Sequence, residues 1–466
     1  MADKPSRPGR WERIQAAIPK HSIVGRILYP MVEERRTLAG VMAWIGLVML
    51  FAILFVAIFA DFISPYNPTI IVDEPMVAPM TNAVIVKNLT ADLVYLPTRW
   101  LGDKTDMVLN DGNYFVSRNV SDFAVLGSFG FRPFTNSIIS VEVLVQSNST
   151  AAAPDNFVEV RVSGDGGATW SVPRRTSLRS SDVGNATDVL DFTSAAPWSI
   201  TALGDTTFLV NITHVKAAGA VEGPVSVDVL RARMTYRSAY HIMGTDNVGQ
   251  DVFSRVLHGT RTSLAIMVIG VSVAFIAGFP LGLFSGYVGG NIDKILVLVM
   301  DSLYSFPGLL MAGIIAVLLG KGVLNIGLAI TVIYIPLYFR VTRSQVLSVR
   351  EELYVEAAKA LGAKPLHVMF SYIAYNVLIA VPVIFSISAA DAILTAAGLS
   401  FLGWGIEAPT PDWGRDLSAG QGLISTGIWW PSFFPGLMIL FLTVSLSFLG
   451  EGLSDIVNPL LRKERS

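Results

Sequence analysis

Residues 37–60 read TLAGVMAWIGLVMLFAILFVAIFA and contain no charged side chain. A helix rises 1.5 Å per residue, so this run is long enough to cross the roughly 30 Å hydrocarbon core of a bilayer. Residues 1–36 carry eight Lys and Arg side chains, a longer basic leader than a cleaved signal peptide has. We therefore expect a retained first transmembrane helix over residues 37–62, preceded by a cytoplasmic N-terminal segment, residues 1–36.

The whole chain has the composition of a membrane protein. Its 466 residues are 52% hydrophobic and only 15% charged, and the mean hydropathy is +0.54. A net charge of -2 hides an uneven distribution, because cations gather at the N-terminus, after residue 340 and at the C-terminus. The absence of cysteine excludes disulfide and thiolate chemistry. The five histidines lack ligand spacing, so we expect no metal site.

Five more apolar runs predict further spans: residues 262–292, 295–320, 322–339, 368–397 and 433–449. The fold class expected is thus an α-helical polytopic membrane protein with six transmembrane helices. Four glycines in the first of these runs suit close helix packing in lipid: Gly270, Gly278, Gly282 and Gly286. Cations gather between the fourth and fifth spans, which by the positive-inside rule places this loop and both termini in the cytoplasm of a plasma-membrane protein; they are Arg340, Arg343, Arg350, Lys359 and Lys364.

Residues 65–240 differ from the rest of the chain. This segment is polar, is interrupted by prolines and contains no apolar run of 18 residues. Apolar and polar residues alternate in residues 140–143, 157–162 and 225–229, as in half-buried strands. We expect an inserted extracellular all-β domain, sandwich-like, with its own core.

Two local patterns lie inside this segment. Residues 163–170, SGDGGATW, resemble the Asp-box hairpin of sialidase-like propellers and other secreted β-domains, here in a single copy. We interpret its key residues as structural, since the carboxylate can accept hydrogen bonds from the turn: Ser163, Asp165, Gly167, Thr169 and Trp170. Five Asn-x-Ser/Thr sequons are candidate glycosylation sites consistent with an extracytoplasmic surface: Asn88, Asn119, Asn148, Asn185 and Asn211.

Residues 355–365, VEAAKALGAKP, lie between two long apolar runs and predict a short exposed helix. Gly362 stands where a left-handed residue can end the helix, and Pro365 prevents its continuation. Three alanines, Ala357, Ala358 and Ala360, predict a flat surface that a partner can approach, with Glu356 and Lys359 fixing the register. We expect this helix to contact another protein.

Several blocks resemble the permease subunits of ABC importers of the dipeptide/oligopeptide/nickel type. Residues 356–362 resemble the cytoplasmic EAA motif of that family. Residues 399–403 (LSFLG), 409–414 (PTPDWG) and 450–453 (GEGL) match later family blocks. Residues 241–255 resemble its Gly-Thr-Asp motif on the outer side through Gly244, Thr245, Asp246, Gly249, Asp251 and Arg255. The resemblance covers the first span and everything from His241 onward, but not the β-domain.

The resemblance implies a transport subunit that is not itself an enzyme and holds no cofactor. A homologous second permease, two cytoplasmic ATPase subunits that bind ATP and Mg, and an extracellular substrate-binding protein are the implied partners, together with the lipid bilayer and no nucleic acid. It also implies that the ATPase is contacted through Glu356, Ala357, Ala358, Lys359, Ala360, Leu361 and Gly362. No Walker loop is present. Peptides are the implied substrate, with oligosaccharide or nickel as alternatives; a receptor with a ligand-binding β-domain is the competing class.

The expected domain boundaries follow from these patterns. After the first span and the β-domain come residues 241–261 as an extracellular motif segment and residues 262–460 as the permease core, with a cytoplasmic EAA loop at 343–372 and a tail at 461–466. Two acids inside spans, Asp301 and Asp391, are candidates for pore lining or for packing, because lipid exposure of a charge is costly. For Asp301 packing is the expected role, and for Asp391 the alternative to pore lining is a pairing with the second permease. Three positions depart from the family pattern: Gln250 replaces an arginine, Ala396 a glutamate, and Tyr375 a helix-breaking proline.

Overall fold

The computed structural model describes residues 37–82, 84–95, 100–101, 115–131, 137–149, 155–177, 187–199, 201–204 and 206–457. The chain divides into two compact units. A helical unit comprises Met1–Ile70 and Gln250–Ser466, and a β unit comprises Ile71–Gly249. The expected N-terminal segment and C-terminal tail lie outside the described residues, as does Asn185.

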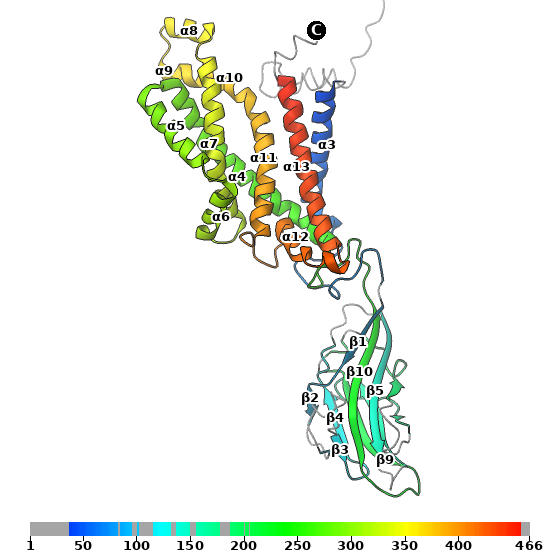
Figure 1. The fold of residues 1–466 in the computed structure, drawn as a ribbon. Helices are drawn as coiled ribbons and strands as arrows, with labels where there is room; N and C mark the ends of the chain where they lie inside the picture. The colour runs from blue at the N-terminus through cyan, green and yellow to red at the C-terminus, as the bar shows by residue number, and fades with distance from the viewer. Residues whose placement is uncertain are drawn as a thin grey trace, which may run out of the picture. The chain divides into compact units, whose positions relative to one another are not determined.

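The helical unit contains the long apolar helices that the sequence predicts (Figure 1). Five of them are long and apolar enough to cross a membrane: α3 (Leu38–Ile63), α4 (Val252–Val288), α7 (Val323–Val349), α11 (Val381–Phe401) and α13 (Trp430–Val457). Shorter helices are α5 (Gly290–Tyr304), α6 (Gly308–Leu319), α8 (Leu353–Ala360), α9 (Pro365–His367), α10 (Tyr375–Val377) and α12 (Trp413–Gln421).

The third expected span is not one straight helix. Helices α5 and α6 are bent by 87° at the break around Pro307. A proline at this position lacks an N–H donor and disfavours helical geometry in the residue before it. Helix α5 begins where α4 ends, and α6 leads to the start of α7 (Figure 1). Among the residues that the structure describes, the candidate spans therefore number five, or six if α5 and α6 together count as one.

Two helices extend beyond the apolar runs from which they were expected. Helix α4 begins at Val252, so the second half of the motif segment 241–261 is helical. Helix α7 continues to Val349, which places the first part of the expected loop 343–372 in a helix. In both cases the helix extends beyond the apolar stretch, because charged side chains near that end of the helix form ion pairs within the protein. Arg255 and Arg343, both paired with aspartates, are examples.

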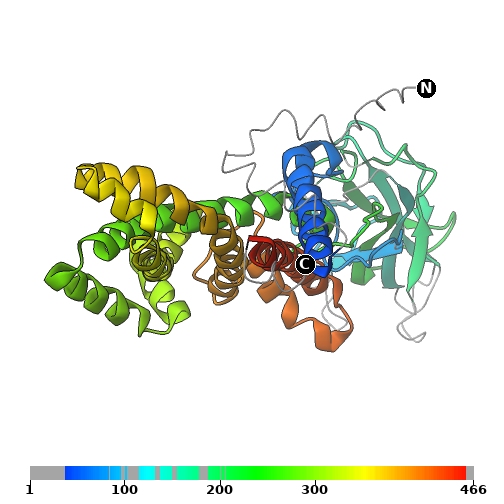
Figure 2. The same ribbon diagram turned by 90° about the horizontal axis from the view of Figure 1, so that it is seen from above.

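Small residues hold the helices together. The four glycines of α4 lie against α7: a Cβ added at Gly270 would meet Ile330, and one at Gly282 would meet the backbone of Phe339. The predicted role of these glycines in close packing is therefore confirmed. Helices α3 and α13 lie side by side when the helices are viewed along their length (Figure 2), with Gly46 against the backbone of Leu449.

The described residues of the β unit form two five-stranded sheets, in which the strand pairings are antiparallel. One sheet has the order β1-β10-β5-β8, with β3 also paired to β10, and the other has the order β2-β4-β9-β6-β7. The strands are β1 (Val84–Leu89), β2 (Leu93–Tyr95), β3 (Phe115–Ser117), β4 (Phe123–Gly127), β5 (Ile138–Ser149), β6 (Asn156–Ser163), β7 (Arg174–Arg175), β8 (Asp188–Asp191), β9 (Leu209–Lys216) and β10 (Val225–Arg237).

Both sheets contribute to one hydrophobic core. Val141 and Val143 of β5 and Val158 and Val160 of β6 are fully buried in the same cluster. These valines belong to the alternating stretches of the sequence, whose period of two turns every second side chain to one face. The expected strands are therefore present, with one face of each sheet buried.

Candidate functional site

Helix α8 ends as its sequence predicts. Gly362 has a φ of +82°, and its N–H donates to the carbonyl of Lys359 at 2.9 Å. The N–H of Ala363 donates to the carbonyl of Ala358 at 3.1 Å. These two bonds form a Schellman motif, in which a left-handed residue satisfies the last carbonyls of the helix. No atom lies within 4 Å of where a Cβ at Gly362 would be, so backbone conformation alone requires glycine within the chain.

One face of α8 packs on the helical unit and the other is open. Val355 is fully buried and Ala358 is 7% exposed, and both are turned toward the body of the unit. The expectation of a flat outer surface is therefore wrong for Ala358, whereas Ala357 and Ala360 are exposed as expected. The outer face carries Leu361, 88% exposed, and Leu353, 81% exposed. Glu356, Ala357, Lys359 and Ala360 are exposed as well, so the outer side of α8 combines two protruding leucines with small and charged side chains.

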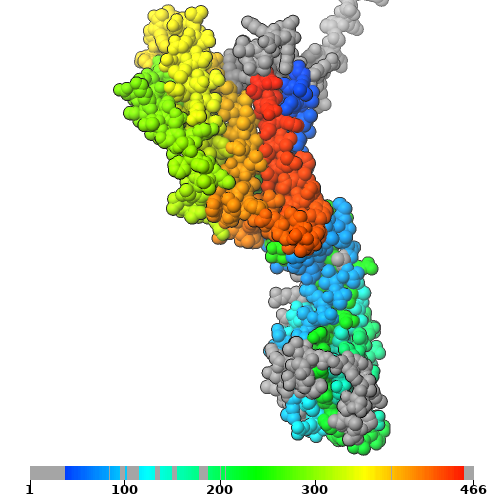
Figure 3. All heavy atoms as spheres, in the orientation of Figure 1, coloured from blue at the N-terminus to red at the C-terminus, as the bar shows by residue number. Residues whose placement is uncertain are grey.

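The buried side of α8 joins a cluster at one end of the helical unit. Its other buried members come from α4, α7 and the segment that follows α9: Leu283, Val346, Val368, Met369, Ile373, Ala374 and Val377. Figure 1 shows α8 at this end, and Figure 3 shows the surrounding yellow surface of the same unit. Val355 of α8 thus shares one buried cluster with side chains of α4 and α7.

The segment after α8 is helical but irregular. A π-helical stretch, Val368–Ala374, is followed by α10 and by a 3-10 turn, Leu378–Ala380, before α11 begins. The fifth span expected from residue 368 therefore starts at Val381 as a regular helix, and Pro382 lies in its first turn. The helix is interrupted although the family's proline is absent at Tyr375. Asn376 Nδ2 donates to the Tyr354 hydroxyl at 3.0 Å, which ties this segment to α8.

Ion pairs hold α5 to α7 near α8. Arg343 donates from Nε and Nη2 to both oxygens of Asp293, at 2.6 and 2.7 Å. Farther along α7, Arg340 pairs with Asp301 at 2.8 Å and lies over the Tyr304 ring at 4.3 Å. Asp301 is thus neutralised inside the chain at a half-exposed position, which favours the packing alternative over pore lining.

The Gly-Thr-Asp motif is divided between the two units. Its first part, in the β unit, pairs with the segment that follows Ile71: Thr245 N–H donates to the Val77 carbonyl at 3.0 Å and Met76 N–H to the Asp246 carbonyl at 2.9 Å. Gly244 and Gly249 have positive φ values. Gly249 also lies too close to the Asp73 carbonyl for any side chain. These hydrogen bonds join two segments of the β unit, residues 71–77 and 244–249, which we call the neck.

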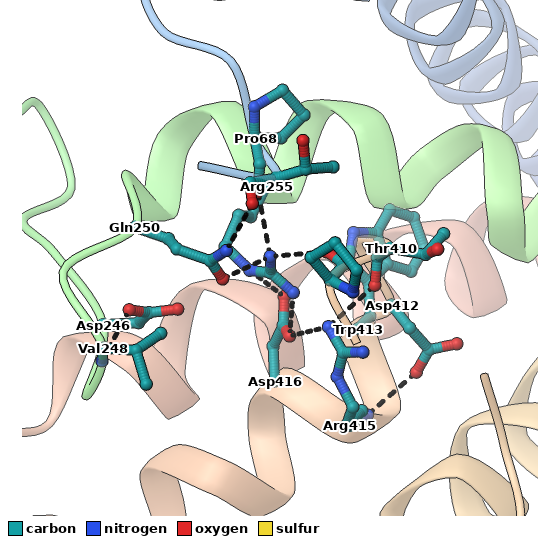
Figure 4. A network of polar contacts seen from close by, with 12 residues as sticks. Pro68, Asp246, Val248, Gln250, Arg255, Thr410, Asp412, Trp413, Arg415 and Asp416 are labelled. Atoms are coloured by element: carbon teal, nitrogen blue, oxygen red, sulfur yellow. Dashed lines mark hydrogen bonds and ion pairs between the residues drawn. The ribbon is translucent and has the colours of Figure 1, made fainter. Parts of the chain in front are cut away.

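Arg255, in the second part of the motif, is the centre of a buried polar network (Figure 4). It is 2% exposed, and its Nε and Nη2 donate to both oxygens of Asp416 at 3.0 and 2.6 Å. Its Nη1 donates to Gln250 Oε1 at 2.7 Å and to the carbonyls of Pro68 and Pro409 at 2.9 and 3.1 Å. Gln250 therefore accepts a bond from Arg255 where an arginine would place a second buried cation. A planar guanidinium can satisfy such a set of acceptors, whereas lysine cannot.

The later motif blocks join the same region. Asp251 is fully buried and caps α4 by accepting from Ser254 N at 2.8 Å. Trp413 Nε1 donates to the Val256 carbonyl at 2.9 Å. Asp412 caps α12, and burial raises the pKa of its carboxyl. The motifs read separately in the sequence thus form one structural core. Asp416 was missed there; its only signal is its place two residues after the PTPDWG block.

Asp391 lies at the middle of α11 and does not belong to the ion pairs or motif contacts described above. Its Oδ2 accepts from the Tyr334 hydroxyl at 2.7 Å, and Tyr334 is 4% exposed. Asp391 itself is exposed. A charge at mid-bilayer costs about 3 kcal/mol on insertion scales, so this face of α11 cannot be lipid-facing without a large penalty. Ala396, by contrast, is buried, so Asp391 does not take the place of the family's glutamate.

The two features of the β unit have structural geometry. Asp165 Oδ1 accepts from Thr169 N at 2.9 Å and from Ser163 Oγ at 2.7 Å, and Oδ2 accepts from Thr169 Oγ1 at 2.6 Å. These bonds lower the pKa of Asp165 to about 2. Gly167 has a φ of +93° and lies against the Trp170 ring. Among the sequons, Asn88 and Asn119 are exposed and Asn148 and Asn211 half-buried.

Among the residues that the structure describes, no group of three or more His, Asp or Glu side chains could hold a metal ion. The absence of a metal stays a prediction.

Comparison with known proteins shows two family matches. Residues 278–463 match the binding-protein-dependent transport system inner membrane component, and residues 35–83 match the N-terminal transmembrane domain of oligopeptide transport permease C. The second match ends one residue before β1, and the neck segment from Ile71 lies within it.

Three curated relatives illustrate the similarity. A dipeptide transport system permease protein from Alkalihalophilus pseudofirmus is 37% identical over 230 residues, which are 49% of this chain and 75% of the relative. A glutathione transport system permease protein from Pectobacterium atrosepticum is 35% identical over 48% of this chain and 74% of its own length. A di/tripeptide transport system permease protein from Pseudomonas aeruginosa is 36% identical, with the same two shares.

Proposed function

Since this chain belongs to the family of inner-membrane components of binding-protein-dependent transport systems, we propose that it imports small peptides. It is a permease subunit of an ABC importer and a multi-pass protein of the plasma membrane; it is not an enzyme, and ATP hydrolysis takes place in separate subunits. The observation that carries the peptide proposal is the set of relatives named for dipeptide, di/tripeptide and glutathione transport, each covered over about three quarters of its length.

In this proposal α8 is the contact with an ATPase subunit. Its outer face, with Leu361 and Leu353, would enter a groove on that subunit, with Glu356 and Lys359 at the rim. Closure of the ATPases would then move α8 as a rigid element, and the buried contacts of Val355 would pass the movement to α4 and α7. A homologous second permease would complete the translocation path, and a second ATPase would bind beneath it.

The orientation is part of the proposal. Five cations lie between the second half of α7 and the segment that follows α8, at positions 340, 343, 350, 359 and 364, and the positive-inside rule assigns that end to the cytoplasm. The first described helix begins and the last ends at the same end of the helical unit as α8 (Figure 1). Both termini would then be cytoplasmic, and the β unit with its sequons extracytoplasmic. The neck that carries Thr245 and Asp246 would face the binding protein.

The substrate is tested by the ligand that the cognate binding protein carries. We expect mass spectrometry of that protein, purified without refolding, to identify peptides of two to a few residues. Proteoliposomes that contain both permeases and both ATPases should then transport a labelled dipeptide only when ATP is on the side of the membrane that holds the ATPases and the binding protein is on the other side. An oligosaccharide or Ni²⁺ as the bound ligand, with no dipeptide uptake, would show that the substrate is wrong.

A further inference from the structure

Helix α11 has one charged side chain, Asp391, at its middle. The residues of α11 near Asp391 that are buried within the helical unit are Ser388, Ala389, Ala390, Ala392 and Ile393. Its neighbours on the other face are open, because Ile387 is 50% exposed and Leu394 is 49% exposed. Ile387, Asp391 and Leu394 are spaced four and three residues apart and so lie along one side of the helix. An acid thus stands between two apolar side chains on a face that the rest of this chain leaves open.

The carboxylate is held in a fixed position. The Tyr334 hydroxyl donates to Oδ2 from the buried side, and one turn away the Tyr338 hydroxyl lies 2.7 Å from Ser388 Oγ. These two pairs join α7 to α11 at successive turns. Asp391 has no ion-pair partner within the residues that the structure describes, unlike Asp293 and Asp301, which each pair with an arginine. Its negative charge is therefore oriented but not neutralised.

We propose that Asp391 is a binding position in the translocation path for the positively charged amino group of the peptide. This inference rests on the proposed function and names the residue that selects its substrate. An ionised carboxylate that accepts one hydroxyl proton keeps further lone pairs for an ammonium donor. A single carboxylate between Ile387 and Leu394 offers one charge contact and modest apolar contact. Such a site can attract a passing peptide without retaining it, as a conducting path requires.

The test compares two substrates in the complete transporter, reconstituted in proteoliposomes with its ATPases and binding protein. One is alanyl-alanine, and the other is its des-amino analogue, in which hydrogen replaces the α-amino group. Maximal uptake of each is measured for the wild type and for Asp391→Asn, which keeps the shape but removes the charge. The same binding protein delivers substrate to the wild type and to the variant. Its own preference between the two substrates therefore cancels when variant uptake is divided by wild-type uptake.

We expect Asp391→Asn to lower uptake of alanyl-alanine about tenfold and uptake of the des-amino analogue less than twofold. Asp301→Asn is the matched control, because it removes an acid that Arg340 already neutralises, and it should change both uptakes equally. Tyr334→Phe removes the hydroxyl that orients the carboxylate and should give the same selective loss in weaker form.

Three outcomes would overturn the inference. Equal loss of both uptakes in Asp391→Asn, with less second permease recovered in the purified complex, would show that the acid pairs with that subunit. Unchanged uptake of both would show that the path lies elsewhere. If the wild type transported neither peptide, the proposed function would fail and the inference with it, whereas the first two outcomes leave peptide transport intact.

Discussion

The apolar tip of α8 offers the sharpest test of how this permease meets its ATPase. Leu361 is 88% exposed in the chain, so almost all of its side chain remains to be buried by a partner. Fully burying a leucine contributes about 1.5–3 kcal/mol. A middle value of about 2 kcal/mol corresponds to about a 30-fold change in a dissociation constant. We therefore predict that Leu361→Ala weakens binding of the ATPase subunit about 30-fold.

The assay is a titration of purified ATPase subunits onto the permease pair in lipid nanodiscs. The variant should keep the thermal melting temperature of the wild type, since the truncated side chain touches little of its own chain. Val172→Ala is the matched control: Val172 is 80% exposed but lies in the β unit, so ATPase affinity should not change. An affinity for Leu361→Ala within twofold of the wild type, with a normal melting temperature, would refute the assignment of this face to the ATPase.

Three further predictions concern the interior. Arg255→Met should leave the buried carboxylate of Asp416 unpaired and lower stability by about 3 kcal/mol, seen as a lower melting temperature in detergent; an unchanged melting curve would contradict the network. Gly282→Leu should separate α4 from α7, because its Cβ would meet the backbone of Phe339, and should reduce the yield of folded protein in size-exclusion chromatography, whereas a normal yield would disprove this contact. Burial lowers the pKa of His214, so its contribution to stability is present above its unfolded pKa of about 6.5 and is lost as pH falls below that value. His214→Asn should therefore flatten the acid dependence of β-unit unfolding, followed by tryptophan fluorescence. An unaltered acid dependence would show that His214 is not its source.

Much of the fold follows from local patterns. The long apolar runs give the spanning helices, because a chain in lipid must satisfy its backbone groups internally. Period-two alternation gives the strands of the β unit in the same way, and Gly362 ends α8 because it alone tolerates the left-handed backbone without strain. Helix boundaries do not follow from hydropathy, as at the start of α4, because hydropathy does not report whether a charged side chain has a partner.

The candidate sites also combine features that are local in the sequence with features that depend on helix packing. The capped helix over residues 356–362 and the motif blocks that accompany it can be predicted from the amino-acid sequence, because capping and hydropathy are properties of neighbouring residues. The burial of Ala358 beside the protruding Leu361, the bond of Arg255 to Asp416 across more than 150 positions and the contact of Asp391 with Tyr334 on an open face become visible only in the folded chain. Those facts depend on which helix packs against which, and no local pattern of residues specifies that choice.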